Sequence, residues 1–151
     1  MIEACNNPES EQWLELRTAL WPQSGREEHL AEMAEFVAEP GKYVQFIFYA
    51  AGQKAIGLAE ASIRSDHVNG TESSPVAFLE GLYVSPKYRR QGIAAALVNE
   101  VKSWALRNSC NELASDVSLD NTVSQSLHLA MGFKETERVV YYKMGLVENG
   151  A

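Results

Sequence analysis

The chain of 151 residues is poor in cysteine, in positive charge and in long apolar runs, and each shortage excludes a class of protein. Its two cysteines, Cys5 and Cys110, lack the paired spacing of zinc or dithiol sites, so we expect reduced thiols. The histidines show no HExxH-type spacing, and no metal is expected. A net charge of -7 argues against nucleic acid and anionic membranes as partners. Because no apolar run approaches membrane-spanning length and no secretory leader is visible, we expect a cytoplasmic protein.

Two common phosphate-binding motifs are absent as well. The chain contains neither GxxxxGK[ST] nor GxGxxG, so a P-loop and a dinucleotide-binding fold are poorly supported. What the chain does contain is 46% hydrophobic residues, an ordinary share for a globular protein with a full core. Its length predicts a single domain over residues 1–151.

Apolar periodicity and turn residues divide the chain into helices and strands. Strands are expected at residues 2–4, 43–50, 55–63, 76–84, 113–117 and 135–144. Helices are expected at residues 10–21, 27–39, 92–108 and 121–131. The middle strands would form an antiparallel meander. The sequence therefore predicts a mixed α/β fold, with a mostly antiparallel central sheet and flanking helices.

The most informative segment is the basic turn around Gly92, which follows an apolar strand and opens a helix. The first amides of a helix have no partner within it and carry the positive end of its dipole. They can therefore bind a phosphate group. Gly92 lets a ligand approach the backbone closely, and Ala94 and Ala95 leave room beside it. Alone, such a turn is a weak signal, because it is also compatible with a simple capped helix start.

The strand 76–84 has a glutamate and a glycine in its middle. Regular alternation would place Glu80 on one face with Phe78 and Leu82, and a carboxylate among apolar neighbours is unusual. Gly81 inside a strand indicates a β-bulge. Glu80 is either a site residue or a glutamate bonded to a neighbouring residue. Asp116, at the end of the next strand, is in the same way either a site residue or a turn former.

The run Arg89-Arg90-Gln91-Gly92-Ile93-Ala94 fits the pattern [RQ]-x-x-G-x-[GA] and resembles the coenzyme A loop of the GNAT acetyltransferases. The order of predicted elements resembles their fold over nearly the whole chain. The resemblance implies acetyl-CoA as co-substrate, with backbone amides near Leu82 and Val84 holding the pantetheine arm and polarising the thioester carbonyl. The coenzyme-binding residues that it implies are Leu82, Tyr83, Val84, Arg89, Arg90, Gln91, Gly92, Ile93, Ala94, Ala95 and Asn121.

Residues 121–133 resemble the family motif N-x-x-A-x-x-L-Y-x-x-x-G-F. The matching residues are Asn121, Leu127, Gly132 and Phe133. Ser124 replaces the alanine, and His128 takes the place of the tyrosine that often protonates the leaving thiolate. The acid is therefore left open between His128 and Tyr142, and His128 is also compatible with simple packing. Asn121 would both cap the helix and contact coenzyme A.

Five segments spread over the chain are similar to aminoglycoside 6'-N-acetyltransferases. They are residues 20–22, 61–70, 74–75 together with 78–81, 114–116 and 135–139. The resemblance implies acetyl transfer to the 6'-amine of an aminoglycoside antibiotic, with a site made of Trp21, His67, Glu80, Asp116 and Glu137. Close relatives often have tyrosine at the His67 position. The carboxylates would accept charge-assisted hydrogen bonds from ammonium groups, and Trp21 would form an apolar or cation–π wall.

The expected mechanism is direct transfer in a ternary complex. Glu80 or Asp116, directly or through water, would deprotonate the amine before it attacks the thioester. No Cys-His pattern supports a covalent enzyme intermediate. Two other functions stay open: acetylation of another polyamine or of a peptide amine, and regulatory binding of acetyl-CoA without turnover.

The end of the chain departs from the family pattern. Family members commonly place two strands after the last helix, whereas the residues after Met131 suffice for one strand and a stub. An open sheet edge is a liability, so a partner subunit is expected to complete or cover it. The sequence therefore predicts a homodimer.

Overall fold

The computed structural model describes residues 1–147, and its chain forms two compact units, each described by itself. The first unit runs from Met1 to Asp116 and contains the sheet, whereas the second begins at Val117. The expectation of one domain over the whole chain stays a prediction.

The first unit is built on a five-stranded sheet in the order β1-β2-β3-β4-β5. The strands are β1 (Ile2–Ala4), β2 (Tyr43–Tyr49), β3 (Ala55–Arg64), β4 (Val76–Val84) and β5 (Leu113–Ser115). The first four pair antiparallel, and β5 pairs parallel to β4. The predicted mixed, mostly antiparallel sheet is thus confirmed, with strand bounds within two residues of those expected from the sequence.

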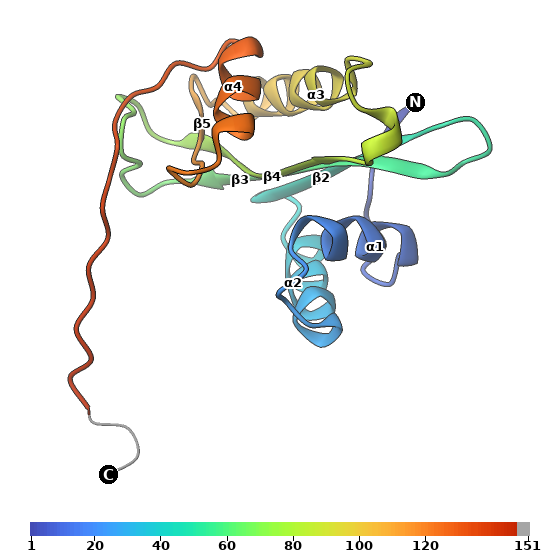
Figure 1. Ribbon diagram of the computed structural model, residues 1–151, viewed down its shortest axis with the longest axis horizontal. Coiled ribbons are helices and arrows are strands. Elements are labelled where there is room, and N and C mark those ends of the chain that lie inside the picture. Colours follow the sequence, from blue (N-terminus) through green and yellow to red (C-terminus); the bar gives the residue numbers. More distant parts are fainter. Residues whose placement is uncertain (148–151) are drawn as a thin grey trace. The chain divides into compact units, whose positions relative to one another are not determined.

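Three α-helices of the first unit cover the two faces of the sheet (Figure 1). Helices α1 (Glu11–Leu20) and α2 (Arg26–Ala38) lie on one face, and α3 (Ile93–Arg107) lies on the other. Helix α1 begins where the Ser10 side chain accepts a hydrogen bond from the Trp13 amide, and it ends before Pro22. A short 3-10 turn (Pro86–Tyr88) links β4 to the loop before α3. None of the helices in residues 1–147 is long and apolar enough to cross a membrane.

The core of the first unit lies on both faces of the sheet. On the α1 side, the aromatic ring of Trp13 and the side chains of Met33, Ile47 and Leu58 are completely buried. On the α3 side, a Cβ atom added to Gly57 would lie 3.1 Å from the side chain of Leu97, so helix and strand approach each other closely there. The sheet is therefore packed on both faces, and this packing positions the ends of β4 and β5.

The second unit contains one helix, α4 (Thr122–Ala130). The Asn121 side chain accepts a hydrogen bond from the Ser124 amide at 3.1 Å, which confirms the predicted cap. At the other end, Gly132 adopts φ 100°, a positive φ of the kind with which helices commonly end at glycine.

The predicted strand at residues 135–144 is wrong for the described chain. Residues 133–145 form neither helix nor strand, and Figure 1 draws them as an extended trace. The β-branched and aromatic residues that suggested the strand are exposed: Val140 by 69%, Tyr141 by 83% and Tyr142 by 91%. A strand exists only when its backbone groups pair with a neighbour, and no described strand pairs with this segment.

Candidate active site

The centre of the candidate site is a β-bulge in β4. Opposite β3, the register passes from Glu60 paired with Gly81 directly to Ala61 paired with Leu79. Glu80 is therefore the extra residue of the bulge, which confirms the bulge predicted from Gly81. The four residues of β4 before the bulge, Val76 to Leu79, are all buried, whereas Glu80 itself is exposed.

The bulge coincides with the end of the pairing between β4 and β5. These strands pair from Ala77 opposite Leu113 to Leu79 opposite Ser115, and β4 then continues to Val84 without a strand on that side. Of the described strands, none meets residues 80–84 there. The backbone of Leu82, Tyr83 and Val84 thus lies along an open edge of β4, beyond the end of β5. Such an edge is where an extended ligand arm can meet backbone amides.

The start of α3 provides amides for an anion. Gly92 adopts φ 78° at the N-cap position and offers no side-chain cap, and Arg90 also has positive φ, 61°. The Ala96 amide donates to the Gly92 carbonyl at 3.0 Å, so the amides of residues 93–95 precede the helical ladder. These three amides and the helix dipole suit a pyrophosphate.

The side chain of Arg89 connects this loop to the unpaired end of β4. Its Nε donates to the Val84 carbonyl at 2.9 Å, and its guanidinium lies 5.8 Å from the centre of the Tyr83 ring. The anion cradle and the open strand edge are therefore adjacent. Their donor set fits coenzyme A, whose pyrophosphate needs amides and whose pantetheine arm can bond to a strand edge.

Glu80 is held by two neighbours on β3. Its Oε1 accepts hydrogen bonds from Ser62 Oγ at 2.7 Å and from the Arg64 guanidinium at 2.8 Å. Arg64 in turn lies over the Phe78 ring, 3.6 Å from its centre. Glu80 is thus bonded to neighbouring residues of the sheet, which is one of the two interpretations that its sequence position allowed. Its side chain is still 34% exposed, and among the described residues no hydrogen bond reaches Oε2.

Trp21 lies directly against the bulge. A Cβ atom on Gly81 would come within 2.5 Å of the Trp21 ring, so only glycine leaves space for this contact. Trp21 directly follows the last residue of α1, and its amide donates to the Arg17 carbonyl at 2.8 Å. The structure therefore brings together Trp21, Gly81 and Glu80 from two elements far apart in the sequence.

The first unit contains two other predicted acceptor residues, Asp116 and His67. Asp116 is exposed and follows β5 directly, beside the point where β4 and β5 separate. His67 is exposed in the loop after β3 and lines a hollow of about 590 Å³. Arg64, the partner of Glu80, lines the same hollow.

The remaining predicted residues belong to the second unit. Asn121 caps α4, and His128 Nδ1 donates to the Ser124 carbonyl at 2.8 Å while its ring packs 5.0 Å from that of Phe133. Glu137 and Tyr142 are exposed in the extended segment. Because these four residues lie outside the unit that contains the bulge, their roles in the site stay predictions.

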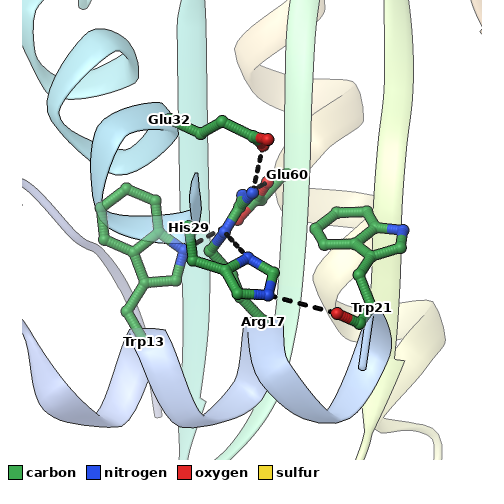
Figure 2. A network of polar contacts seen from close by, with 6 residues as sticks. All are labelled: Trp13, Arg17, Trp21, His29, Glu32 and Glu60. Atoms are coloured by element: carbon green, nitrogen blue, oxygen red, sulfur yellow. Dashed lines mark hydrogen bonds and ion pairs between the residues drawn. The ribbon is translucent and has the colours of Figure 1, made fainter. Parts of the chain in front are cut away.

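Sequence reasoning missed a buried polar cluster between α1, α2 and β3, drawn in Figure 2. At its centre Arg17 is 1% exposed and forms ion pairs with Glu60 and Glu32. Trp13 Nε1 donates to Glu60 at 2.8 Å. Burial raises the pKa of the Glu60 carboxyl, whereas the contacts from Arg17 and Trp13 act to lower it. The cluster also contains His29, which is 1% exposed.

One signal could have revealed these residues. Arg17 lies one turn after Trp13 on the buried face of α1, His29 one turn before Met33 on α2, and Glu60 within the buried run of β3. A charge at such a position needs a buried partner, but a sequence does not say which one. Residues 1–147 contain no group of His, Cys, Asp and Glu that could hold a metal, and both cysteines are free and buried.

Comparison with known proteins agrees with this geometry. The model of the acetyltransferase (GNAT) family matches residues 10–133. Aminoglycoside N(6')-acetyltransferase type 1 of Serratia marcescens is 49% identical to this chain, covering 97% of the chain and 99% of that protein. The enzyme of the same name from Acinetobacter genomosp. 13 is 53% identical over 87% of the chain and 88% of its own length.

Solved structures lead to the same family. The apo crystal structure of aminoglycoside 6'-N-acetyltransferase AAC(6')-IG from Acinetobacter haemolyticus superposes with a TM-score of 0.91 at 44% identity, covering 97% of this chain and 99% of that one. AAC(6')-Iy in complex with the bisubstrate analog CoA-S-monomethyl-acetylneamine gives a TM-score of 0.90 at 45% identity, covering 96% and 97%. Since the family model spans most of the chain and these relatives match it almost end to end, the chain belongs to the acetyltransferase (GNAT) family.

Proposed function

We propose that this protein transfers the acetyl group of acetyl-CoA to the 6'-amino group of aminoglycoside antibiotics and thereby inactivates them. The observation that carries the proposal is the bulge at Glu80 and Gly81, which lies between an opened strand edge and the wall formed by Trp21. It occurs in a chain about half identical to enzymes named aminoglycoside N(6')-acetyltransferase.

The donor substrate would lie along β4 and α3. Backbone amides of Leu82, Tyr83 and Val84 would hold the pantetheine arm, and residues 89–95 would bind the pyrophosphate. Asn121 would complete this side. Acetyl-CoA supplies an activated thioester, and an amide of β4 would stabilise the charge that develops on its carbonyl oxygen.

The acceptor would lie on the other side of the bulge. Trp21 would form an apolar wall, and Glu80, Asp116 and Glu137 would accept hydrogen bonds from ammonium groups. His67 would contact the sugar from the loop after β3. Because Arg64 already bonds to Oε1 of Glu80, an incoming ammonium would bind Oε2 or displace Arg64.

Proton transfer would involve two kinds of group. The 6'-ammonium must lose a proton before its nitrogen can attack, and Glu80 or Asp116, directly or through water, would accept it. The amine would then attack the thioester directly, so that the enzyme forms no covalent bond to the acetyl group. His128 or Tyr142 would protonate the departing thiolate.

We also propose that the protein works as a homodimer in the cytoplasm, where acetyl-CoA is available. The dimer is supported by the exposed apolar residues of the C-terminal segment, among them Val140, Tyr141 and Met144. An apolar surface of this kind is usually covered by a partner. It is further supported by β5, which forms one edge of the sheet.

A thiol-release assay with DTNB tests the enzymatic function. Purified protein is supplied with acetyl-CoA and, separately, with kanamycin, tobramycin, spermidine and a lysine peptide. Release with the two antibiotics and 6'-acetylated products by mass spectrometry are expected. Release with spermidine or the peptide alone would point to another amine as substrate. Binding of acetyl-CoA without turnover on any amine would instead indicate a regulatory module.

A further inference from the structure

Trp21 is held by contacts to both its ring and its backbone. One side of its ring rests on Gly81, and the Arg17 guanidinium lies 4.9 Å from the ring centre. Its backbone is held as well, because its amide donates to Arg17 and its carbonyl oxygen lies 3.2 Å from His29 Nε2. Ring and backbone of this one residue are therefore both constrained, and both through the same buried cluster.

The partners of His29 determine its tautomer. Arg17 Nε donates to His29 Nδ1 at 3.2 Å, so Nδ1 must carry a lone pair. The ring proton therefore lies on Nε2, where it is donated to the Trp21 carbonyl oxygen. His29 thus links the Arg17 guanidinium to the backbone of Trp21, as Figure 2 shows.

Arg17 is itself held by partners from two other elements. Its terminal nitrogens bond to Glu60 on β3 and to Glu32 on α2, which leaves Nε for His29. Each link depends on the one before it: the carboxylates orient Arg17, Arg17 orients His29, and His29 holds Trp21. Buried ion pairs are weak evidence for a gain in stability, so their presence calls for another explanation.

The cluster borders a hollow of about 210 Å³ beside Trp21, lined by Arg17, Trp21, Ser24, His29 and Glu32. Arg17 and His29 are each only 1% exposed, whereas the Glu32 side chain is 40% exposed. A ligand in this hollow would therefore meet Trp21 and Glu32 rather than the buried side chains of Arg17 and His29. Arg17 and His29 would therefore act on a ligand through the residues that they hold: Glu32 for Arg17, and Trp21 for both.

We propose that Arg17 and His29 are positioning residues that hold Trp21 against the β4 bulge and so shape the acceptor site. The proposal rests on the proposed function, because it takes Trp21 as a wall for the aminoglycoside. It requires that the loss of either contact raises the KM for the acceptor. The KM for acetyl-CoA and kcat stay unchanged, since the donor side is formed by β4 and α3.

Two substitutions of His29 separate its two hydrogen bonds. His29→Gln places an amide N–H near the position of Nε2 and keeps the donor to Trp21, whereas His29→Asn keeps only an acceptor near Nδ1 for Arg17. We expect His29→Asn to raise the KM for kanamycin about tenfold and His29→Gln to raise it less than about threefold. Arg17→Lys keeps the charge but lacks the Nε–H, and it should behave like His29→Asn.

A matched control and a double variant test whether the effect passes through Trp21. Met33→Ala removes a completely buried side chain one turn along α2, so it should lower Tm but leave the acceptor KM unchanged. Trp21→Ala should raise the acceptor KM, and adding His29→Asn to it should raise it no further.

Two outcomes would overturn the proposal. One is that His29→Asn and Arg17→Lys lower Tm, as Met33→Ala does, without changing the acceptor KM. The other is that His29→Asn raises that KM by the same factor with and without Trp21. A wild-type protein that acetylates no aminoglycoside would instead contradict the proposed function, so the two failures are distinguishable.

Discussion

At the scale of single residues, the chemistry of the site depends on how Glu80 is bonded. Oε1 accepts from both Ser62 and Arg64, while the side chain keeps 34% of its surface exposed. Asp116 is exposed and follows the strand that ends opposite the bulge. Either carboxylate is therefore accessible to an amine or to a bridging water, and the two assignments need separate tests.

The first prediction concerns the base. Glu80→Gln and Asp116→Asn keep shape and hydrogen bonding but remove the proton acceptor, so the variant that lacks the base should lose kcat/KM by about a hundredfold or more. Thiol release with kanamycin at neutral pH measures this loss. Glu100→Gln, on the exposed side of α3, is the control and should keep wild-type activity. If both site variants keep full kcat/KM, neither carboxylate is the base.

The second prediction concerns Gly81. An added Cβ would lie 2.5 Å from the Trp21 ring and 3.0 Å from Leu20, so Gly81→Ala forces Trp21 away from the bulge. We expect a loss of about 1–3 kcal/mol in the free energy of unfolding, together with a higher acceptor KM. Urea denaturation and steady-state kinetics measure the two effects. Gly41→Ala, whose Cβ would meet nothing within 4 Å, should not reduce stability in this way.

At the scale of elements, local patterns predicted most of the sheet and all four helices. Gly81 predicted the bulge, because glycine in a strand interior packs no side chain. Asn121 predicted the start of α4, because its side chain can cap a helix. These features depend on a few consecutive residues. A sequence contains the information for them directly.

Features that depend on a partner could not be predicted in the same way. Arg17, His29 and Glu60 lie on three elements, and only the fold shows that they meet. The segment 135–144 has the composition of a strand, but composition does not supply a neighbouring strand. The pairing of Glu80 with Arg64 is likewise a property of two adjacent strands.

The third prediction concerns the start of α3. Gly92 adopts φ 78° with free space around it, so Gly92→Ala strains the backbone by about 1–2 kcal/mol and moves the amides of the anion cradle. The KM for acetyl-CoA should rise and the acceptor KM should not. Gly52→Ala is the matched control, because Gly52 has φ 81° and equally open surroundings in the β2–β3 turn. Equal effects of both variants on the acetyl-CoA KM would contradict the cradle.

At the scale of the whole molecule, the C-terminal segment is the basis of the proposed homodimer, because its apolar side chains are exposed. Val139 is 46% exposed, and the residues after it are more exposed, up to 91% at Tyr142. Backbone and side chains of this segment would both gain from a partner strand. A dimer formed in this way would depend on backbone hydrogen bonds as well as on apolar contacts.

The fourth prediction tests that dependence. Proline has no N–H to donate, so the double variant Val140→Pro with Tyr141→Pro should weaken dimerisation at least about tenfold if the segment pairs as a strand. The double variant Val140→Ile with Tyr141→Phe keeps both N–H groups and the apolar side chains and should remain dimeric. Sedimentation equilibrium at micromolar concentration compares them. A wild-type chain that sediments as a clean monomer would contradict the dimer itself.

The pair formed by Arg64 and Glu80 has a consequence for selectivity among acceptors. Oε1 already has a cationic partner from the protein itself. An ammonium group that displaces Arg64 exchanges one cation for another, so attraction between opposite charges contributes little net free energy at that atom. Such an exchange favours an amine that is better placed to bond to Oε1 than the Arg64 guanidinium is. The enzyme would then distinguish aminoglycosides by where their amines lie on the rings rather than by how many they carry.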